Sequence, residues 1–582
     1  MALNDEQLRA IHAPSPTLVN ASAGSGKTRC LIAKIESILK TGAPPASVCA
    51  ITFTNKAANE MKSRLRGFNI NDMQISTIHS MCVRIIRSFY KHTYLRPPFS
   101  IYDNNDQLSV IKTILKARNI TTQPNEVLSA ISRAKSDDLV DDLDGKSVDE
   151  VHTITLGDIY KAYQQILIKN NACDFDDLQL LAIQCLEHKD CRDYFMGLWK
   201  HILVDEFQDT SIIQFRIIQL LYNKATTKNL FVVGDSNQSI YAFRSAHPEN
   251  MVEFQRKYHP TVCYLTYNYR SCPDIIKQAN GFLQYGKPMV AKSSNKGNIS
   301  MSAWDSLEDE ANKIATGISL MDNHEETAIL YRVNSRSLFF EQTLARMGIS
   351  YQVIGDKPFF QRRVVRDMLA YLKASANPSD LESTARIVNV PKRGFGEAKQ
   401  EKLYLEGRTY LEYMALEMPV IEDFLKLLKD IIGMVPHRAI TEVLDRTGYR
   451  QALTKDSDLN MLTALLEAVQ QYKTVDELIL ASTFLERDTG KGVKLMTAHA
   501  SKGLEFDRVF VVGVEFDTWP HKFSTDIDEE SRLFYVACTR ARRYLNISYS
   551  RSKTYRGTRV DLYPSVLFKR AYQNLYGKPM KG

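Results

Sequence analysis

The chain has 582 residues, of which 44% are hydrophobic and 24% charged, a composition typical of a folded globular protein. This length exceeds what one hydrophobic core supports, so we expect several domains. The net charge of +8 and the pI near 8.8 favour a polyanionic partner such as nucleic acid. No apolar run approaches the ~20 residues of a membrane helix, and the polar start lacks a signal peptide's apolar segment, so we expect neither.

The nine cysteines are scattered along the chain, and none forms a C-x-x-C pair. Disulfide frameworks and zinc or iron–sulfur sites use closely spaced cysteines. We therefore predict reduced thiols in a cytoplasmic protein.

A segment of small residues near the N-terminus, residues 21–28 (ASAGSGKT), lies between two regular patterns. Leu18 and Val19 indicate a strand before it, and apolar residues on one face of residues 29–40 indicate a helix after it. A strand, a small-residue loop and a helix start form a phosphate cradle, since backbone N–H groups can close around phosphate oxygens. Lys27 would then reach the β- and γ-phosphates, and the Thr28 hydroxyl would hold Mg²⁺. The first position of the pattern is alanine, not glycine, and a chance glycine turn at a helix start is the alternative.

A glutamine, Gln7, lies just upstream of this loop. Its amide offers both a donor and an acceptor, which suits the edge of an adenine. The alternative is a helix cap followed by a polar surface residue.

Two more strand patterns follow, at residues 48–53 and 75–80, the first with a helix start behind it. In an open α/β sheet, ligands bind at the carboxyl ends of the strands. The residues there suit a single nucleic acid strand, because an aromatic ring stacks on a base and polar groups hold phosphates. They are Phe53, Asn55, Lys56, Thr77 and His79. Core packing is the alternative for Phe53 and His79.

A buried strand at residues 201–204 ends in two adjacent acids, Asp205 and Glu206. A phosphate loop needs such a partner. Asp205 would complete the Mg²⁺ shell, and Glu206 would orient and deprotonate an attacking water.

A further strand at residues 230–235 leads into a short segment with mixed chemistry. Gln238 could sense the γ-phosphate, while Tyr241, Phe243 and Arg244 could face a nucleic acid. A loop with both could pass nucleotide state to a track. The alternative is that the two aromatic residues are core residues on a short helix.

Together these blocks resemble ordered motifs of the superfamily 1 DNA helicases, in the UvrD/Rep (PcrA-like) branch. The blocks that carry the resemblance are residues 21–28, 52–58, 205–210, 233–244, 268–271, 328–332, 495–506 and 533–541. They occur in the family's order, and the similarity runs from about Leu3 to Arg543. Where the family more often has tryptophan, this chain has Phe243, which still stacks on a base with less area.

The resemblance implies an α/β fold with two RecA-like parallel-sheet motor domains, each with a mostly helical insertion. The expected domains are the first motor domain at 1–87 and 173–262 with an insertion at 88–172, and the second motor domain at 263–372 and 489–582 with a shortened insertion at 373–488. The last of these segments ends in a short basic tail.

The resemblance also implies ATP with Mg²⁺ between the motor domains. The expected catalytic residues are Lys27, Asp205, Glu206, Gln238, Arg270 and Arg540, with Thr28 and Asp205 at the metal. The expected nucleotide contacts are Gln7, Ala23, Gly24, Ser25, Gly26, Lys27, Thr28, Arg29, Tyr269, Arg270, Gly503, Glu505 and Arg540. Tyr269 and Arg29 would stack on the adenine, and Arg270 and Arg540 resemble arginine fingers supplied by the second motor domain.

For DNA, the resemblance adds Arg332, Asn334, Lys392 and Arg393 to the residues named above, and it implies that Thr497 and His499 couple ATP to DNA. Lys392 and Arg393 lie in a glycine-containing turn that resembles the family's duplex-contacting block. A simple loop with solvated basic residues is the alternative.

The sequence thus predicts an ATP-dependent 3′-to-5′ DNA helicase of repair or replication, acting at single-strand/duplex junctions. We expect a monomer in solution, with self-association on DNA and protein partners left open. Two alternatives stay open: a single-strand translocase that displaces bound proteins and unwinds weakly alone, and a DNA-binding regulator whose ATP site is only a switch.

Overall fold

The computed structural model describes residues 3–149, 154–241, 247, 249–294, 296–355, 357–377, 380–393, 422–453, 456–485, 491–555 and 558–580. The chain packs into two compact units. The first is Met1–Ser294 with Ser531–Thr539, and the second is Asn295–Glu530 with Arg540–Gly582. This is a division by packing, and the domain boundaries expected from the sequence stay predictions.

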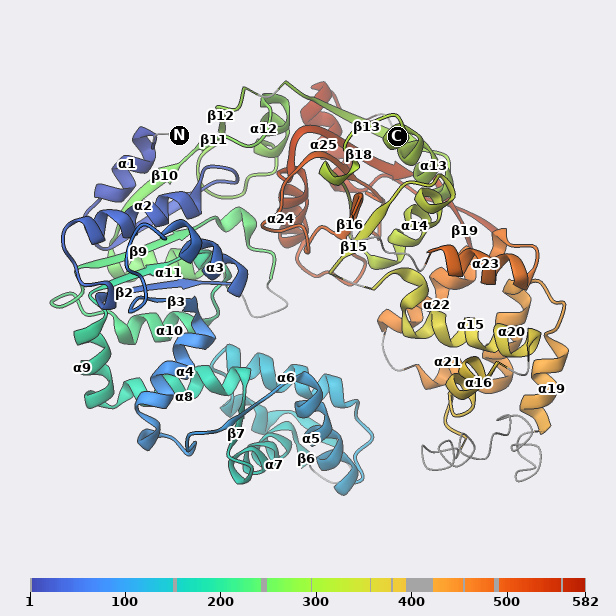
Figure 1. The fold of residues 1–582 in the computed structure, drawn as a ribbon, viewed down its shortest axis with the longest axis horizontal. Coiled ribbons are helices and arrows are strands. Elements are labelled where there is room, and N and C mark those ends of the chain that lie inside the picture. The colour runs from blue at the N-terminus through green and yellow to red at the C-terminus, as the bar shows by residue number, and fades with distance from the viewer. Residues whose placement is uncertain are drawn as a thin grey trace. The chain divides into compact units, whose positions relative to one another are not determined.

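The first unit is built on a six-stranded parallel sheet (Figure 1). Its strands in spatial order are β10 (Thr261–Leu265), β1 (Thr17–Ala21), β9 (Asn229–Gly234), β8 (His201–Val204), β2 (Val48–Thr52) and β3 (Gln74–Thr77). Successive residues of a strand point to opposite faces, so Leu18 and Val19 enter different cores. Both faces are buried, which explains the nearly continuous apolar runs of these strands.

Helices cover both faces of this sheet. One face packs against α1 (Asp5–His12), α2 (Lys27–Lys40) and α3 (Asn55–Arg64). The other packs against α4 (Ile78–Ser88), α8 (Phe175–Glu187), α9 (Lys189–Leu198), α10 (Ile212–Leu221) and α11 (Glu249–Tyr258). The strand predicted at 75–80 ends at Thr77, because the Thr77 hydroxyl accepts from the Ser80 N–H and caps α4.

A mostly helical segment between α4 and α8 has its own core. Its helices are α5 (Asn104–Ala117), α6 (Pro124–Ser136) and α7 (Leu156–Lys169), and its short strands are β4 (Ser100–Tyr102), β5 (Ser147–Asp149), β6 (Ile154–Thr155) and β7 (Ala172–Asp174). Helices α8 and α9 then precede the return to the sheet at β8, the strand that the sequence predicted at residues 201–204.

The second unit has its own six-stranded parallel sheet. Its strands in spatial order are β13 (Asn298–Trp304), β18 (Ala541–Ser550), β17 (Phe506–Val511), β14 (Thr327–Tyr331), β16 (Val493–Thr497) and β15 (Tyr351–Ile354). Helices α13 (Leu307–Ser319) and α14 (Ser337–Arg346) share a core with it, and α25 (Val566–Tyr576) packs Phe568 against Tyr549.

A second helical segment gathers around α15 (Arg363–Ala376) in another core. Its other described helices are α16 (Leu381–Ile387), α19 (Glu422–Asp430), α20 (Pro436–Thr447), α21 (Tyr449–Ala452), α22 (Asp456–Ala468) and α23 (Val475–Leu485). In the part of the chain that the structure describes, the remaining strands and α-helices are β11 (Tyr267–Asn268), β12 (Val290–Ala291), α12 (Pro273–Asn280), α24 (Ile527–Cys538), β19 (Ser552–Tyr555) and β20 (Thr558–Asp561).

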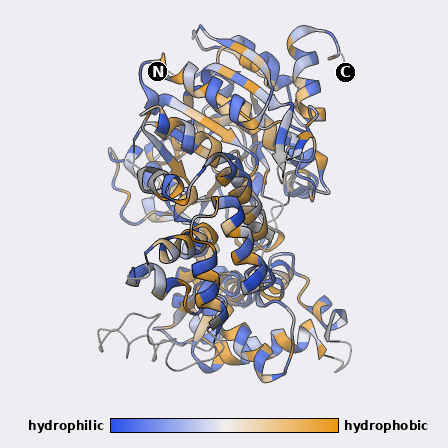
Figure 2. Cartoon of the chain, turned by 90° about the vertical axis from the view of Figure 1, so that its right-hand side faces the viewer, coloured by the Kyte–Doolittle hydropathy of each residue, from blue (hydrophilic) through white to orange (hydrophobic). Residues whose placement is uncertain are grey.

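The predicted α/β fold class, with two parallel sheets and many accompanying helices, is confirmed. Hydrophobic and hydrophilic residues interchange along the helices in Figure 2, as amphipathic packing requires. Among the described helices, none combines the length and apolar character of a membrane span. All nine cysteines are free thiols.

Candidate functional site

The loop between β1 and α2 owes its shape to two glycines. Gly24 and Gly26 have φ of +65° and +84°, a region that side chains disfavour. A Cβ on Gly24 would lie 2.6 Å from Asn268 Nδ2, and a Cβ on Gly26 would lie 2.8 Å from Gln7 Nε2. The alanine at the first position of the pattern, Ala21, is the last residue of β1, so its extended backbone does not require glycine.

Side chains from two other segments fix the loop through its carbonyl oxygens. Gln7 Nε2 donates to the Ser25 carbonyl at 3.0 Å, and Asn268 Nδ2 donates to the Ala23 carbonyl at 2.7 Å. Gln7 is buried, and its Oε1 accepts from the Asn4 N–H at 3.1 Å in a capping box of α1. These two bonds hold the loop in place before the start of α2, and a glycine-containing loop at a helix start can bind an anion through its N–H groups. The adenine contact of Gln7 stays a prediction.

Lys27, the first residue of α2, is the least satisfied charge in this region. Its side chain is 11% exposed and its Nζ has no hydrogen-bond partner among the described residues. Two carboxylates stand just beyond hydrogen-bond distance, Glu206 at 3.9 Å and Asp235 at 3.8 Å. A buried ammonium without a bonded partner is costly, so the position suits an anion that supplies oxygens.

The acids at the end of β8 are held by an unusual backbone. Glu206 has φ of +50°, a left-handed conformation that costs a non-glycine residue about 1–3 kcal/mol. Its N–H donates to Asp205 Oδ1 at 3.0 Å, and its Oε2 accepts from Gln208 Nε2 at 2.5 Å. Burial and the Glu206 charge raise the pKa of Asp205 to about 7, against the lowering effect of Lys27.

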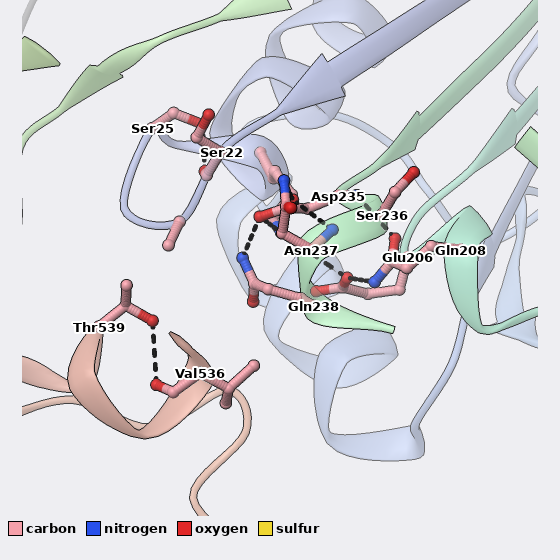
Figure 3. Close-up of polar contacts among 12 residues, drawn as sticks. Ser22, Ser25, Glu206, Gln208, Asp235, Ser236, Asn237, Gln238, Val536 and Thr539 are labelled. Carbon is pink, nitrogen blue, oxygen red and sulfur yellow. Dashed lines mark hydrogen bonds and ion pairs between the residues drawn. The ribbon is translucent and has the colours of Figure 1, made fainter. Parts of the chain in front are cut away.

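The loop after β9 closes the same site (Figure 3). Gln238 Nε2 donates to Asp235 Oδ2 at 2.6 Å, and the Asp235 N–H donates to Gln208 Oε1 at 2.9 Å. Gln238 therefore lies against the carboxylate nearest to Lys27. The structure thus brings together Lys27, Asp205, Glu206 and Gln238.

These residues fit a nucleotide with a divalent cation. The buried Lys27 ammonium has the carboxylates of Glu206 and Asp235 as neighbours, and together with Asp205 these acids leave an excess of negative charge. A cation would favour ionised Asp205, and phosphates would supply the oxygens that Lys27 lacks. In the described residues, no group of three His, Cys, Asp or Glu forms a protein-only metal site. Thr28 and Arg29 lie in the first turn of α2.

Tyr269 and Arg270 lie beside this loop within the first unit. The Tyr269 N–H donates to the Gly24 carbonyl at 3.0 Å, and its ring is 39% exposed with Oη bonded to Asn4 Nδ2 at 2.6 Å. Arg270 Nη1 donates to the Thr539 carbonyl at 3.2 Å. The adenine stack and arginine-finger roles stay predictions.

The remaining predicted nucleotide contacts belong to the second unit. Arg540 is buried and its Nη1 donates to the Leu504 carbonyl at 3.2 Å. Gly503 is exposed with φ of +83°, and Glu505 lies 3.7 Å from Arg542 Nη1. Arg540 and Gly503 are thus on neighbouring segments of that unit.

Two aromatic residues predicted to contact DNA pack on each other at the strand ends of the first unit. The rings of Phe53 and Tyr241 are 5.6 Å apart and nearly parallel, with Phe53 38% exposed. Asn55 and Lys56 are exposed in the first turn of α3, next to Phe53. Phe243 and Arg244 lie outside the described residues.

Thr77 and His79 have structural partners in the first unit. Thr77 caps α4, and His79 Nε2 lies 3.2 Å from Gln179 Nε2, with its ring edge-on to Phe175. Burial lowers the pKa of His79. His79 is half-buried, and its contact with a nucleic acid stays a prediction.

In the second unit, Arg332 forms a two-point ion pair with Glu530, at 2.7 and 2.9 Å. Asn334 is half-buried at the start of a 3₁₀ turn. Lys392 is exposed, whereas Arg393 donates to the Ile387 carbonyl at 2.8 Å and lies over the Phe424 ring. Arg332 and Arg393 thus have protein partners, and their DNA contacts stay predictions.

Family models match nearly the whole chain. The UvrD/REP helicase N-terminal domain matches residues 3–259, and the UvrD-like helicase C-terminal domain matches residues 263–552. The chain belongs to the UvrD/REP helicase family. The ATP-dependent DNA helicase PcrA of Staphylococcus epidermidis is 33% identical over 633 aligned residues, covering 98% of this chain and 87% of the relative. PcrA of Staphylococcus aureus is also 33% identical, covering 98% and 86%.

The predicted resemblance is confirmed, and so is the enzyme class at the level of the UvrD/REP family. Sequence reasoning gave no role to Asp235 and Gln208, which the structure places beside Lys27 and Glu206. Asp235 had a usable signal, because it directly follows a buried strand next to β1, as Asp205 follows β8. Gln208 had none, since its role depends on the turn after Glu206.

Proposed function

We propose that this chain is an ATP-driven motor that moves 3′-to-5′ along single-stranded DNA and separates duplexes, in DNA repair or replication. The observation that carries the ATP part is the buried Lys27 ammonium at the start of α2. It lies near the carboxylates of Glu206 and Asp235 and has no hydrogen-bond partner among the described residues. Membership of the UvrD/REP family supports the DNA part.

Lys27 and the loop N–H groups hold the phosphates in this proposal, and Arg270 and Arg540 neutralise charge on the transferred group. Thr28 and Asp205 hold Mg²⁺, which supplies further charge neutralisation when bound. Tyr269 and Arg29 contact the adenine with Gln7, and Gly503 and Glu505 contact the ribose and phosphates.

Glu206 is the general base that accepts the proton of the attacking water at its carboxylate. Gln208 supports this role, because its amide fixes Glu206 Oε2 at 2.5 Å. A Glu206→Gln variant is expected to bind ATP and hydrolyse it about 10²–10⁴-fold more slowly. A normal hydrolysis rate would place the base elsewhere.

DNA lies across the strand ends, where Phe53 and Tyr241 offer a stacking platform and Asn55 and Lys56 hold the backbone. Base stacking is worth about 1–3 kcal/mol per base, which grips without sequence preference. The other proposed contacts are Thr77, His79, Phe243, Arg244, Arg332, Asn334, Lys392 and Arg393. One base-pair step is worth about 1.4 kcal/mol, a modest load for one ATP.

Strand separation on duplexes with a 3′ tail, a 5′ tail or no tail, with ATP and Mg²⁺, tests the proposal. Unwinding only with the 3′ tail is the expected result. A preference for the 5′ tail would overturn the polarity and leave the ATP site intact.

The short second insertion favours one further candidate, a translocase that displaces proteins from single strands and unwinds weakly alone. ATP turnover stimulated by single strands, without unwinding, would move the proposal there. A slow turnover that DNA cannot stimulate would instead indicate a nucleotide-gated DNA-binding regulator.

A further inference from the structure

Residues Ser531–Cys538, most of α24, pack with the first unit together with Thr539, which follows the helix. Arg532 on this helix is only 4% exposed. Its Nε donates to the Ser239 carbonyl at 2.8 Å, and its Nη1 donates to Gln284 Oε1 at 3.0 Å. Ser239 directly follows Gln238, the predicted γ-phosphate sensor, so the guanidinium holds the backbone of that loop.

Further hydrogen bonds join the loop at Asn237 to the segment that contains Gln284. Asn237 Oδ1 accepts from the Gln284 N–H at 2.9 Å, and Asn237 Nδ2 donates to the Tyr285 carbonyl at 2.9 Å. Arg532 therefore reaches the loop twice, directly at Ser239 and through Gln284 at Asn237. Ser239 Oγ also donates at 3.2 Å to the carbonyl of Gln208, which lies in the turn after Asp205 and Glu206.

This loop joins the two predicted functions of the first unit. At its start, Asp235 binds Gln238 and stands 3.8 Å from Lys27 Nζ. At its end, Tyr241 stacks on Phe53. Residues 235–240 between them are all nearly inaccessible to solvent. A shift of Asp235 and Gln238 therefore has to move the stacked rings of Phe53 and Tyr241 or break the buried hydrogen bonds that hold residues 235–240.

The other end of the helix contacts the predicted arginine finger. The Thr539 carbonyl, directly after α24, accepts from Arg270 Nη1 at 3.2 Å. Arg532 and Thr539 are about two helical turns apart, roughly 10 Å along a rigid element. A displacement of Arg270 can therefore be passed to the Ser239 carbonyl along α24, from Thr539 to Arg532. This route adds to the one along residues 235–240.

We propose that Arg532 is the positioning residue through which α24 transmits nucleotide state to the Phe53–Tyr241 stack. This inference rests on the proposed function. The guanidinium suits the task because its planar fork places two donors at fixed angles, one on Ser239 and one on Gln284. Lysine offers a single nitrogen and cannot reproduce both directions.

The test compares Arg532→Gln with the unaltered protein and with Arg256→Gln. The control removes an exposed arginine of α11 whose guanidinium pairs with Glu253 on the same helix. Three quantities are measured: ATP turnover without DNA, turnover with saturating oligo-dT, and the dissociation constant of fluorescent oligo-dT with and without a non-hydrolysable ATP analogue. Melting temperatures report the fold.

In the unaltered protein and in R256Q, the analogue is expected to change oligo-dT affinity by about 5-fold or more. In R532Q, this ratio is expected to fall to about one and stimulation by oligo-dT to disappear, while basal turnover and analogue-free affinity stay within about threefold. Arg532→Lys is expected to restore part of the ratio, because its ammonium keeps the positive charge and can donate to one of the two acceptors. These separate readouts distinguish coupling from packing.

An R532Q variant that keeps the affinity ratio would overturn the inference. So would a parallel loss of basal turnover, analogue-free affinity and melting temperature in both R532Q and R532K, because that pattern indicates packing alone. A lack of DNA stimulation in the unaltered protein would overturn the proposed function itself, and the inference with it.

Discussion

Two buried lysines of the first unit, Lys27 and Lys135, have opposite surroundings. Lys135 on α6 is fully buried and its Nζ lies 2.7 Å from both Asp174 and Asp177, under the ring of Tyr163. Lys27 Nζ is also buried, but its carboxylate neighbours stay at 3.8 and 3.9 Å and no described residue bonds to it.

Burial alone lowers the pKa of Lys135, but Asp177 and Asp174 outweigh it and hold that pKa above its ordinary value. The Lys135 ammonium is thus neutralised by the protein itself, and the cluster ties α6 to the start of α8. The Lys27 ammonium still lacks oxygens at bonding distance. A buried charge with bonded partners indicates a structural role, and one without them indicates a ligand site.

The largest expected effect follows from replacing Lys135, whose charge is paired within the protein. Lys135→Met leaves Asp174 and Asp177 buried without a cation, which costs about 3–5 kcal/mol of unfolding free energy. Urea denaturation should show an earlier transition, while ATP turnover per folded molecule stays unchanged. Adding Asp174→Asn and Asp177→Asn should return much of the loss, and a single variant as stable as the parent protein would remove the structural assignment.

Replacing Lys27 should have the opposite pattern of effects, with a large loss of ATP turnover and a small change in unfolding free energy. Lys27→Ala is expected to lower ATP turnover by at least about 10²–10³-fold, because a charged donor to the phosphates is lost. Its unfolding free energy should change by less than about 1 kcal/mol, since no hydrogen bond is broken. Steady-state kinetics and urea denaturation check both parts, with the exposed Lys112→Ala as control. Normal turnover would end the phosphate assignment.

Aromatic residues allow the same kind of comparison. Phe53 is exposed and stacks on Tyr241, whereas the aromatic residues of the core are buried. Phe53→Ala is expected to weaken oligo-dT binding by about 1–3 kcal/mol and leave basal ATP turnover unchanged. Fluorescence anisotropy measures the affinity, with the exposed Tyr194→Ala on α9 as control. Equal loss in both variants would argue against a stacking platform.

The smallest effect concerns a neighbour of the Lys135 cluster. Burial and the Asp174 charge raise the pKa of Asp176 to about 6. A raised carboxyl pKa contributes stability that is complete below about pH 4 and is lost as pH rises through about 6.

Asp176→Asn is therefore expected to match the parent protein near pH 4 and exceed it by about 1–2 kcal/mol near pH 8. The amide can still accept from Ser132 Oγ, which donates to Asp176 at 2.6 Å. Urea denaturation at both pH values checks the difference. A variant that is less stable near pH 8 would show that the charged form is favoured by its neighbours.

Sequence patterns predicted the local elements well where one signal dominated. The strand before the loop, the helix after it, and the strands just before Asp205 and Asp235 lie where the sequence patterns placed them, to within a few residues. Periodicity failed at residues 78–80, which begin α4, because a threonine cap overrides the strand propensity of the neighbouring residues. It also gave no sign that Lys135 is buried, since a lysine among polar residues resembles a surface position.

The sequence by itself determined the family and the two parallel sheets, because these depend on short segments whose spacing is fixed along the chain, and it predicted the phosphate loop from one of those segments. Only the tertiary structure decided which charges are neutralised. Lys135 meets acids from 39 residues away, and Arg532 meets a carbonyl 293 residues away. Hydrogen bonds act over about 3 Å, so such partners depend on how distant segments pack.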